Sequence, residues 1–493
     1  MDTGEVFSPF ASQAPGSGAQ HEARHGQGIS AFTGRKGGLT ASADMLVDAA
    51  DPVKVTRLSL VNEGPTPRKL RVYAYAEWVL GNNRGRSAPM FVPSVDQASG
   101  ALLVQNPYSL DFGDRVAFFA ADRAASSHTS DRGEFIGRTG SAILPDSVAS
   151  GAVLSGTVEA GRDTCSAMAW DIDLAPGGNA ELLLVMGDAA SAEEASAFVQ
   201  KHQQRPFADR VTETEAQWRG FLDTLQVETP DVALNAMVNH WLPYQALACR
   251  VRARAGFYQA SGAFGFRDQL QDTMALLTHD PELARAQIVN AASRQFPEGD
   301  VQHWWLPRTG AGVRTMISDD VVWLGYSVAH FIRVTGDRSI LKHELPFIQG
   351  DALKEGEHDS FFTPEVSKQK AIIYEHAARA LDLAVKRTAA TGIPLILGGD
   401  WNDGMNRVGE GGKGDSVWLG WFLLKTLHDF APIAQDQGDH QRVEAWLAHA
   451  AKLKAALEKS GWDGEWYRRG SFDDGSPLGS KSSDEFRIDS IAQ

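Results

Sequence analysis

The spacing of apolar residues changes once along this chain, at about residue 190, and that change constrains the fold most strongly. Before it, apolar and polar residues alternate with a period of two, as in residues 54–64 and 68–80, and this period predicts β-strands. After it the period becomes 3.6, which predicts helices. We therefore expect a sandwich or barrel of antiparallel β-sheet followed by a helical domain.

Turn sequences separate the predicted strands. Asn62 to Pro65 and Pro176 to Asn179 combine glycine, proline and asparagine, which favour tight turns. The second turn joins the apolar runs 167–175 and 180–187, so it predicts a β-hairpin. No catalytic motif is found among these strands.

The second part of the chain is predicted to contain helices joined by long loops rich in Gly, Trp, Asp and Arg. The expected helices span residues 191–202, 209–225, 231–253, 268–279, 281–296, 318–335, 371–389, 415–437 and 440–460. We expect a β domain over 1–205 and a helical linker over 206–250. The layout of 251–493 resembles an all-helical barrel in which inner and outer helices alternate. Such a barrel needs six helix pairs, and residues 484–493 look like the opening of another helix. We therefore expect a barrel that is incomplete at the C-terminus.

Charge and composition restrict the partners. A net charge of −15 would repel nucleic acids and anionic membranes, so we expect neither as a partner. Residues 1–10 lack the basic and apolar regions of a signal peptide, and no stretch approaches the roughly 20 apolar residues of a membrane-spanning helix. Its two cysteines, Cys165 and Cys249, are too few for a disulfide framework or a zinc site. We expect a cytoplasmic protein without membrane contact of its own, which leaves open a membrane-embedded parent protein and a homodimer.

Residues 398–418 contain seven glycines and four acidic residues around two tryptophans. A calcium loop of the helix-loop-helix type needs an oxygen ligand at its fifth position, which is occupied here by Gly404. A nucleotide-binding Walker loop needs Ser or Thr after its lysine, but Gly414 follows Lys413. Calcium and nucleotide binding of these kinds are therefore not expected.

Acid catalysis is the interpretation of this segment that remains. A carboxyl group beside Trp401 would lose hydration, which raises its pKa, so Asp400 or Asp403 would stay protonated near neutral pH and protonate a leaving oxygen. The indole ring of Trp401 would also stack on a sugar ring. A structural turn explains Asp-Trp-Asn-Asp equally well on composition alone.

Three other loops contain the side chains that a neutral, polyhydroxylated ligand needs: aromatic rings that stack and charged groups that pair with hydroxyls. Acidic residues at helix starts, such as Asp268 and Asp319, also stabilise the helix dipole without any ligand, and each alone is best explained in that way. Their convergence on one rim of the barrel favours a carbohydrate site. The candidates are Arg267, Asp268, Asp272, Trp304, Trp305, Arg314, Asp319, Asp320, Glu357, His358 and Asp359.

The sequence contains, in chain order, DTGEVFSP, RHGQG, GFRDQLQD, EGDVQHWWLP, GVRTMISDD, GDWNDGMNRVGEGGKGDSVWLGWFL and DEFRIDSIAQ. These segments resemble glycoside hydrolase family 94, the inverting phosphorylases of β-glucosidic bonds, and within it the C-terminal domains of cyclic β-1,2-glucan synthases. The resemblance covers essentially the whole chain, and its most specific segment surrounds Asp403. It implies a β-sandwich, a helical linker and an (α/α)6 barrel.

The resemblance also implies roles for individual residues. Asp403 would be the general acid, Trp401 would lie in the neighbouring sugar subsite, and Arg267 and Asp272 would bind the glucose at the non-reducing end. Inorganic phosphate would be the co-substrate, so no cofactor, metal or catalytic base is expected. A β-glucan oligosaccharide would yield α-glucose 1-phosphate and a glucan shorter by one unit. Further candidates for substrate contacts are Trp304, Trp305, Arg314, Asp319, Asp320 and Asp400.

Members of this family continue past RIDSIAQ into further helices that complete the phosphate site, so we expect a fragment that is inactive alone. Two alternatives stay open. An inverting β-glucan hydrolase needs a second carboxylate to activate water, for which Glu375, Glu357 and Asp320 are candidates. A carbohydrate-binding remnant would hold glucan without cleaving it.

Overall fold

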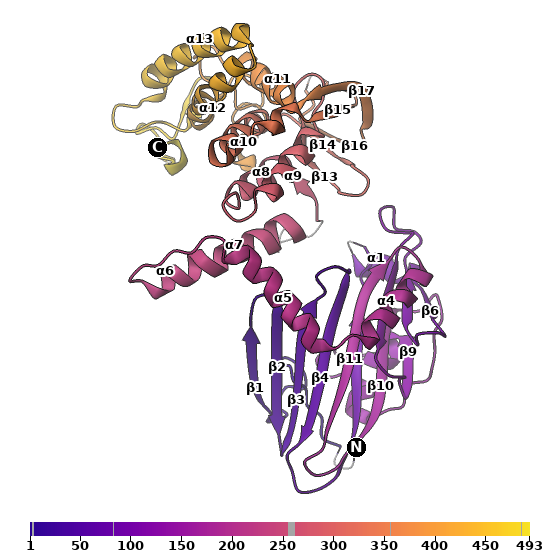
Figure 1. Ribbon diagram of the computed structural model, residues 1–493. Coiled ribbons are helices and arrows are strands. Elements are labelled where there is room, and N and C mark those ends of the chain that lie inside the picture. The colour runs from indigo at the N-terminus through magenta and orange to yellow at the C-terminus, as the bar shows by residue number, and fades with distance from the viewer. Residues whose placement is uncertain (2–3, 82, 255–261, 355, 485) are drawn as a thin grey trace. The chain divides into compact units, whose positions relative to one another are not determined.

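The computed structural model describes residues 1, 4–81, 83–254, 262–354, 356–484 and 486–493. They form two compact units, Met1–Phe221 and Leu222–Gln493 (Figure 1). The region predicted as a linker is shared between them. Its first helix, α5 (Phe207–Leu222), lies almost entirely within the first unit, and its later helices lie in the second.

The first unit is an antiparallel β-sandwich, as the period of two predicts. Its large sheet has the order β1-β2-β3-β4-β11-β8-β7-β6, and a smaller sheet has the order β5-β10-β9. The large sheet contains β1 (Gln20–His25), β2 (Ile29–Lys36), β3 (Leu39–Val47), β4 (Val53–Asn62), β6 (Val92–Val95), β7 (Leu102–Gln105), β8 (Val116–Ala121) and β11 (Asn179–Ala189). The small sheet contains β5 (Arg68–Glu77), β9 (Ser127–Asp131) and β10 (Thr164–Leu174).

The hairpin predicted around Pro176–Asn179 is wrong, because β10 and β11 belong to different sheets. β10 pairs with β5, whereas β11 pairs with β4 and β8. The side chain of Asn62 explains the crossing, since its amide donates to the carbonyls of Leu174 and Ala175 at 3.3 and 3.1 Å. The turn is therefore a corner between two sheets, fixed by a residue more than 100 positions away.

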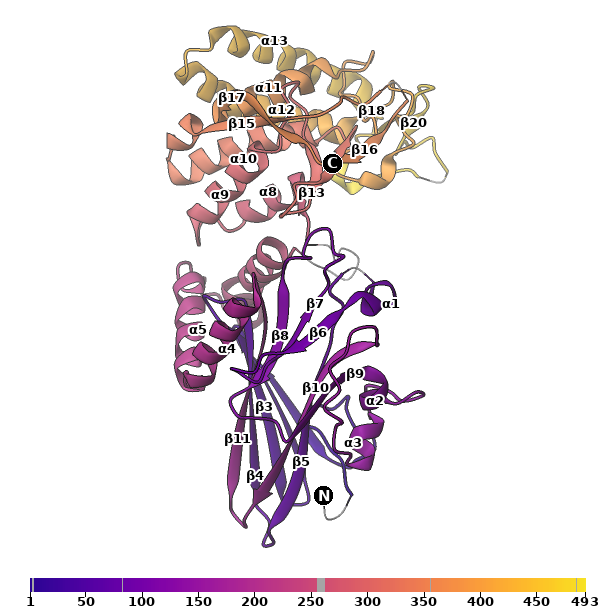
Figure 2. The same cartoon turned by 90° about the vertical axis from the view of Figure 1, so that its right-hand side faces the viewer.

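Helices cover the outer face of the large sheet, so its central strands are buried on both sides (Figure 2). Along β8, Val116, Phe118 and Ala120 share an apolar core with residues of α4 (Ala192–Gln204) and α5, whereas Ala117, Phe119 and Ala121 face the sandwich interior. Short helices complete the unit: α1 (Arg84–Ser87), η1 (Ala88–Met90), α2 (Arg132–Ile136) and α3 (Asp146–Ser150).

From α8 onward, the helices of the second unit lie in two layers. One layer holds α8 (Phe266–Met274), α10 (Asp320–Thr335) and α12 (Val417–Asp436); the other holds α9 (Pro281–Ala292), α11 (Ile373–Lys386) and α13 (His440–Ala456). α10 packs against α8, α9, α11 and α12. Its buried residues lie all around the helix, as a central position requires.

A further helical stretch precedes these layers, formed by α6 (Val232–Ala236), η2 (Met237–Trp241), α7 (Leu242–Gln245) and η3 (Ala246–Ala253). Among the residues that the structure describes, none of the helices combines the length and apolar character needed to cross a lipid bilayer.

Several loops expected to be irregular form short antiparallel sheets. One has the order β12-β13-β14-β16, the second pairs β15 with β17, and the third has the order β18-β19-β20. The strands are β12 (Phe264–Gly265), β13 (Gln302–Trp305), β14 (Gly312–Thr315), β15 (Glu344–Gln349), β16 (Asp359–Phe362), β17 (Glu365–Ile372), β18 (Asp415–Ser416), β19 (Gly470–Ser471) and β20 (Pro477–Leu478). The strands of two to four residues are too short to show a period, whereas β15 and β17, with six and eight residues, were missed by the sequence interpretation.

Short helical turns occupy the remaining loops: η4 (Ser339–Lys342), η5 (Asp403–Met405), η6 (Leu457–Gly461) and η7 (Ser490–Ala492). The helix expected to open within 484–493 is reduced to η7, which Asp489 caps by accepting a hydrogen bond from the Ile491 amide.

Candidate active site

The N-terminal ends of α8, α10 and α12 come together in the second unit. Arg267 is the second residue of α8, Asp319 precedes α10, and Ser416 precedes α12. The segment 398–405 lies over these helix ends, because its carbonyl and carboxylate oxygens accept hydrogen bonds from Arg267 and Ser416. The partial positive charge of helix N-termini favours acidic groups in such a place.

Arg267 is the centre of this cluster. Its Nη1 donates to both carboxylate oxygens of Asp319, at 3.3 and 3.4 Å, and to the carbonyl of Asp400 at 3.1 Å. Its Nη2 donates to Oδ1 of Asp403 at 3.0 Å. One buried guanidinium therefore ties α8 to α10 and to the Asp-Trp-Asn-Asp segment.

Asp403 is the carboxylate of this cluster that water reaches, with 55% of its side chain exposed. Partial burial acts to raise its pKa, but the hydrogen bond and charge of His303, together with the charge of Arg267, outweigh burial and hold the pKa below its ordinary value. The expectation of a raised pKa was therefore wrong for this carboxyl. Together, the two neighbouring cations have a larger effect on this pKa than the loss of hydration.

Asp400 has a different environment, although only two residues separate it from Asp403. Its carboxylate is fully buried and accepts hydrogen bonds from Arg469 Nη2 at 2.5 Å, Ser416 Oγ at 2.6 Å and the Asn402 amide at 3.1 Å. These contacts anchor the segment to α12 and leave Asp400 no surface for a substrate.

The tryptophans also divide into exposed and buried rings. Trp401 is 43% exposed, and its Nε1 donates to Oε1 of Gln271 on α8 at 3.2 Å. Trp304 is half-buried against Phe361. Trp305 is buried in the core, stacked on Phe264 with ring centroids 5.5 Å apart. Trp401 is therefore the ring best placed to meet a sugar.

Two predicted contact residues lie outside the Arg267 cluster. Arg314 is buried and forms a two-point ion pair with Asp300, with both distances 2.7 Å. Asp272 lies about 140° around α8 from Arg267 and accepts from Arg250 Nε at 2.9 Å. Burial raises the pKa of Asp272 to about 6, against the opposing charge of Arg250.

Asp319 precedes α10 and Asp320 is its first residue, but Asp319 does not cap the helix with its side chain. It accepts hydrogen bonds from Arg267 and from Trp323 Nε1, the latter at 2.8 Å, and burial raises its pKa. Stabilisation of the helix dipole is therefore not enough to explain an aspartate at position 319.

His303 is a member of the site that the sequence interpretation missed. Its Nδ1 lies 2.8 Å from Oδ2 of Asp320, and its Nε2 lies 3.8 Å from Oδ2 of Asp403. Burial opposes the charged form, but Asp320 and Asp403 outweigh it and raise the pKa of His303 to about 10. The only signal in the sequence was a histidine beside two tryptophans, which is weak evidence for a catalytic position.

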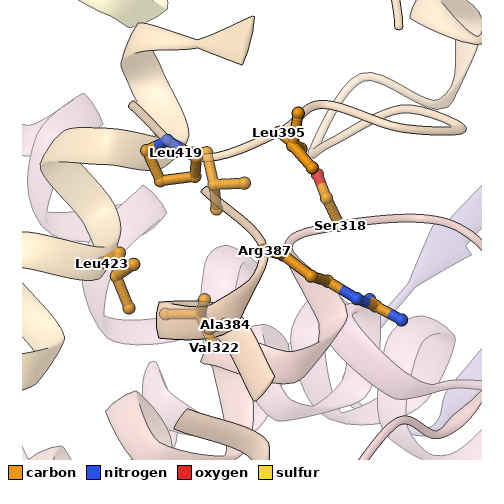
Figure 3. A pocket seen from close by; sticks show the side chains of 8 residues that line it. Ser318, Val322, Ala384, Arg387, Leu395, Leu419 and Leu423 are labelled. Atoms are coloured by element: carbon orange, nitrogen blue, oxygen red, sulfur yellow. The ribbon is translucent and has the colours of Figure 1, made fainter. Parts of the chain in front are cut away.

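Two hollows lie near these helices. A cavity of about 10 Å³ between α10, α11 and α12, shown in Figure 3, has room for one water molecule and no ligand. A more open cleft of about 560 Å³ has aromatic walls and is lined by Trp323, Tyr326, Trp418, Trp421, Phe422, Lys425, Tyr467, Ile491, Ala492 and Gln493. Neither hollow includes Asp403.

The first unit contains a cluster with metal-ligand chemistry, formed by Asp48, Asp51 and His202. Arg210 Nη1 lies 3.2 Å from Asp48, and Lys201 Nζ lies 2.5 Å from Asp51. Protein cations therefore already neutralise these carboxylates. Among the described residues, no other group of this kind was found.

Comparison with known proteins places both units in one family. Residues 1–205 match the glycosyl hydrolase 94 supersandwich domain, and residues 217–493 match the glycosyl hydrolase 94 superfamily catalytic domain. The whole chain is 53% identical to cyclic β-(1,2)-glucan synthase NdvB of Rhizobium meliloti (strain 1021), covering 17% of that protein. It is 28% identical to solabiose phosphorylase of Paenibacillus borealis, where 99% of this chain matches 60% of the relative.

A solved structure has the same fold at low sequence identity. A bacterial glucoamylase complexed with acarbose superposes with a TM-score of 0.61 at 10% identity, covering 92% of this chain and 61% of the glucoamylase. The predicted fold, a β-sandwich followed by the (α/α)6 barrel of this catalytic domain, is confirmed. The chain thus belongs to the glycosyl hydrolase 94 superfamily, which includes glycoside phosphorylases.

Proposed function

We propose that this chain is the phosphorolytic part of an enzyme that acts on β-1,2-glucan oligosaccharides. Phosphate attacks the anomeric carbon while the enzyme protonates the departing glycosidic oxygen, so the products are α-glucose 1-phosphate and a glucan shorter by one unit. Phosphate is the co-substrate, and the reaction needs no cofactor. A cytoplasmic location stays a prediction.

The contrast between Asp403 and Asp400 is the observation that carries this proposal. A general acid must lie within hydrogen-bond reach of the leaving oxygen. Asp403 is 55% exposed, whereas Asp400 is fully buried with both carboxylate oxygens occupied. Asp403 is therefore the acid, and Asp400 holds the segment in place.

The surroundings of Asp403 fit a sugar. The exposed indole of Trp401 offers an apolar face to a pyranose ring. Arg267 holds Oδ1 of Asp403, which fixes the direction of the carboxyl group. Asp272 lies on another face of α8, and its binding of the glucose at the non-reducing end is part of the proposal.

The relatives support the choice of substrate and nucleophile. NdvB is named as a cyclic β-(1,2)-glucan synthase, and the more distant relatives include phosphorylases for solabiose and N,N'-diacetylchitobiose. These names favour a β-linked glucan as the sugar and phosphate as the nucleophile.

Hydrolysis receives less support because each of its candidate bases already has a hydrogen-bond partner. Glu375 accepts hydrogen bonds from Arg379 and Arg442 at 2.8 and 2.6 Å, and Oδ2 of Asp320 is held by His303. Glu357 is exposed and accepts from the Lys354 amide at 2.9 Å. Phosphate is already an anion and needs no such base.

The test is to incubate the full gene product, and the 493-residue chain beside it, with β-1,2-linked gluco-oligosaccharides. Glucose 1-phosphate and free glucose are measured with and without inorganic phosphate. We expect α-glucose 1-phosphate that depends on phosphate. Glucose release at the same rate without phosphate would support hydrolysis, and binding without any product would support a carbohydrate-binding role.

A further inference from the structure

Asp403 is ionised in the free site, although the proposed function requires it to donate a proton. A general acid has to hold a proton when the leaving oxygen departs. The two cations beside Asp403, Arg267 and His303, lower its pKa, so the free site holds a carboxylate at neutral pH. A proton source within reach of this carboxylate is therefore required.

His303 is the group in reach. Asp320 holds its Nδ1 at 2.8 Å, and this contact fixes the ring so that Nε2 lies towards Oδ2 of Asp403, 3.8 Å away. The ring is only 16% exposed and the Asp320 side chain only 4%. A small rotation of the Asp403 side chain that keeps its Oδ1 on Arg267 closes the remaining gap between Nε2 and Oδ2.

The charged groups around His303 come from three elements. Asp320 belongs to α10, Asp403 belongs to η5, and Arg267 on α8 pairs with both Asp403 and Asp319. Oδ1 of Asp320 is buried and has no hydrogen-bond partner among the described residues, so Asp320 contacts the imidazole through Oδ2 alone. The carboxylates favour the imidazolium form, and His303 is protonated in the free site.

We propose that His303 supplies the proton that Asp403 delivers, so that the acid of the reaction is a pair of side chains held by Asp320. This inference rests on the proposed role of Asp403. His303 acts through Asp403 and is a positioning residue, not one that touches the sugar.

The proton moves in three steps. A bound sugar removes water from the pair, and loss of water favours neutral imidazole and carboxylic acid over the two ions. The proton therefore passes from His303 Nε2 to Oδ2 of Asp403. Asp403 then gives it to the glycosidic oxygen as the bond from that oxygen to carbon 1 breaks and the bond from phosphate to carbon 1 forms. Asp403 is again a carboxylate, and solvent returns a proton to His303.

The test compares the pH dependence of kcat/KM for the wild-type enzyme and His303→Gln. Glutamine keeps a hydrogen-bond donor towards Asp403 but cannot supply a proton. In the wild type the proton belongs to the pair, so activity should persist towards the pKa of His303, about 10. In the variant only Asp403 can hold the proton, and an aspartate ordinarily loses it at acidic pH, so the alkaline limb should move down by several pH units. Turnover at pH 7 should fall roughly 10- to 100-fold with KM changed by less than about threefold.

The control is His428→Gln, because His428 is exposed on α12. It should leave the pH profile unchanged. An equal loss of kcat/KM at every pH in His303→Gln, with the alkaline limb in its original position, would overturn the proposal and indicate a structural role.

A second measurement needs no turnover. Titration of the His303 imidazole by NMR should show a protonated ring through pH 8 in the wild type and earlier loss of the proton in Asp320→Asn. A neutral ring at pH 7 in the wild type would overturn the proposal. If the wild type releases glucose and not glucose 1-phosphate, the proposed nucleophile is wrong, and the pH comparison on glucose release still decides the role of His303.

Discussion

Each compact unit contains a cluster of histidine, aspartate and arginine, and the two clusters differ in whether water reaches a carboxylate. In the sandwich, the side chains of Asp48, His202 and Arg210 are 2%, 0% and 1% exposed. In the helical unit, the side chains of Arg267 and His303 are 7% and 16% exposed, but that of Asp403 is 55% exposed. The closed cluster can only hold the fold together, whereas the open one can give a proton to a ligand.

The histidines of the two clusters also differ in charge. Burial lowers the pKa of His202, with Arg210 adding to the effect and Asp51 opposing it. Two carboxylates outweigh burial and raise the pKa of His303 to about 10. The same three residue types therefore produce a neutral histidine in one unit and a cationic one in the other, depending on which charges lie nearest.

The largest expected effect is the loss of turnover in Asp403→Asn. The amide keeps the shape of the carboxyl group but cannot donate an acidic proton, and proton donation contributes about 10²- to 10⁴-fold. We expect turnover to fall by about that factor while the melting temperature and glucan binding change little, since the side chain is exposed. Steady-state kinetics and thermal unfolding of the full gene product measure both. Unchanged turnover would show that the exposed cluster around Asp403, like the buried one in the sandwich, has no catalytic role.

The closed cluster should respond in the opposite way. Asp48→Asn breaks buried ion pairs with Arg205 and Arg210, at 3.0 and 3.2 Å, and should destabilise the sandwich by about 3 kcal/mol. Turnover per folded molecule should stay at the wild-type level. Denaturant unfolding gives the stability, and Glu215→Gln is the control, because its exposed pair with Arg219 should contribute no more than about 0.5 kcal/mol. Equal effects of the two substitutions would contradict this account.

A smaller effect is expected for Trp401→Ala. The exposed indole should contribute about 0.5–1.5 kcal/mol to sugar binding, so KM should rise roughly 2- to 10-fold with kcat nearly unchanged. Trp305→Phe, in the core, is the comparison, since it should lower stability and leave KM unchanged. A KM that rises only in Trp305→Phe would place the sugar elsewhere.

The effects of pH on the stability of the two units should have opposite signs. The folded pKa of His303 is raised from 6.5 to about 10, so its contribution to stability is complete below about pH 6.5 and is lost as the pH rises towards 10. The folded pKa of His202 is lowered from 6.5, so its contribution is present above pH 6.5 and is lost as the pH falls. Hydrogen exchange of peptides from each unit reports the two responses separately. If the stability of both units changed in the same direction with pH, one of the two histidines would have been assigned the wrong charge.

The sequence predicted most of the fold because the period of apolar residues is a local property. The sandwich, the helices and their order follow from it. The sheet partners of β10 and β11 do not, since the carbonyls around that turn are held by Asn62. The short strands β18, β19 and β20 depend on pairing across the fold and have no period of their own.

The candidate site was predicted in part. The glycine-rich segment with Asp400 and Asp403 was identified, but its composition could not say which carboxyl is exposed. That difference depends on Arg469, which lies 69 residues after Asp400. The contact between His303 and Asp403 spans 100 positions, so no local pattern could reveal it.

The most direct test of the central claim uses a leaving group that needs no proton. We expect Asp403→Asn to lose about 10²- to 10⁴-fold in turnover on a β-1,2-linked gluco-oligosaccharide, but less than about tenfold on 2,4-dinitrophenyl β-glucoside. 2,4-Dinitrophenolate departs as an anion and needs no proton, whereas the glycosidic oxygen of the oligosaccharide does. The comparison of the two substrates therefore isolates proton donation to the leaving group. This result would establish Asp403 as the group that protonates the leaving oxygen. An equal loss on both substrates would contradict that assignment and make Asp403 a binding or structural residue.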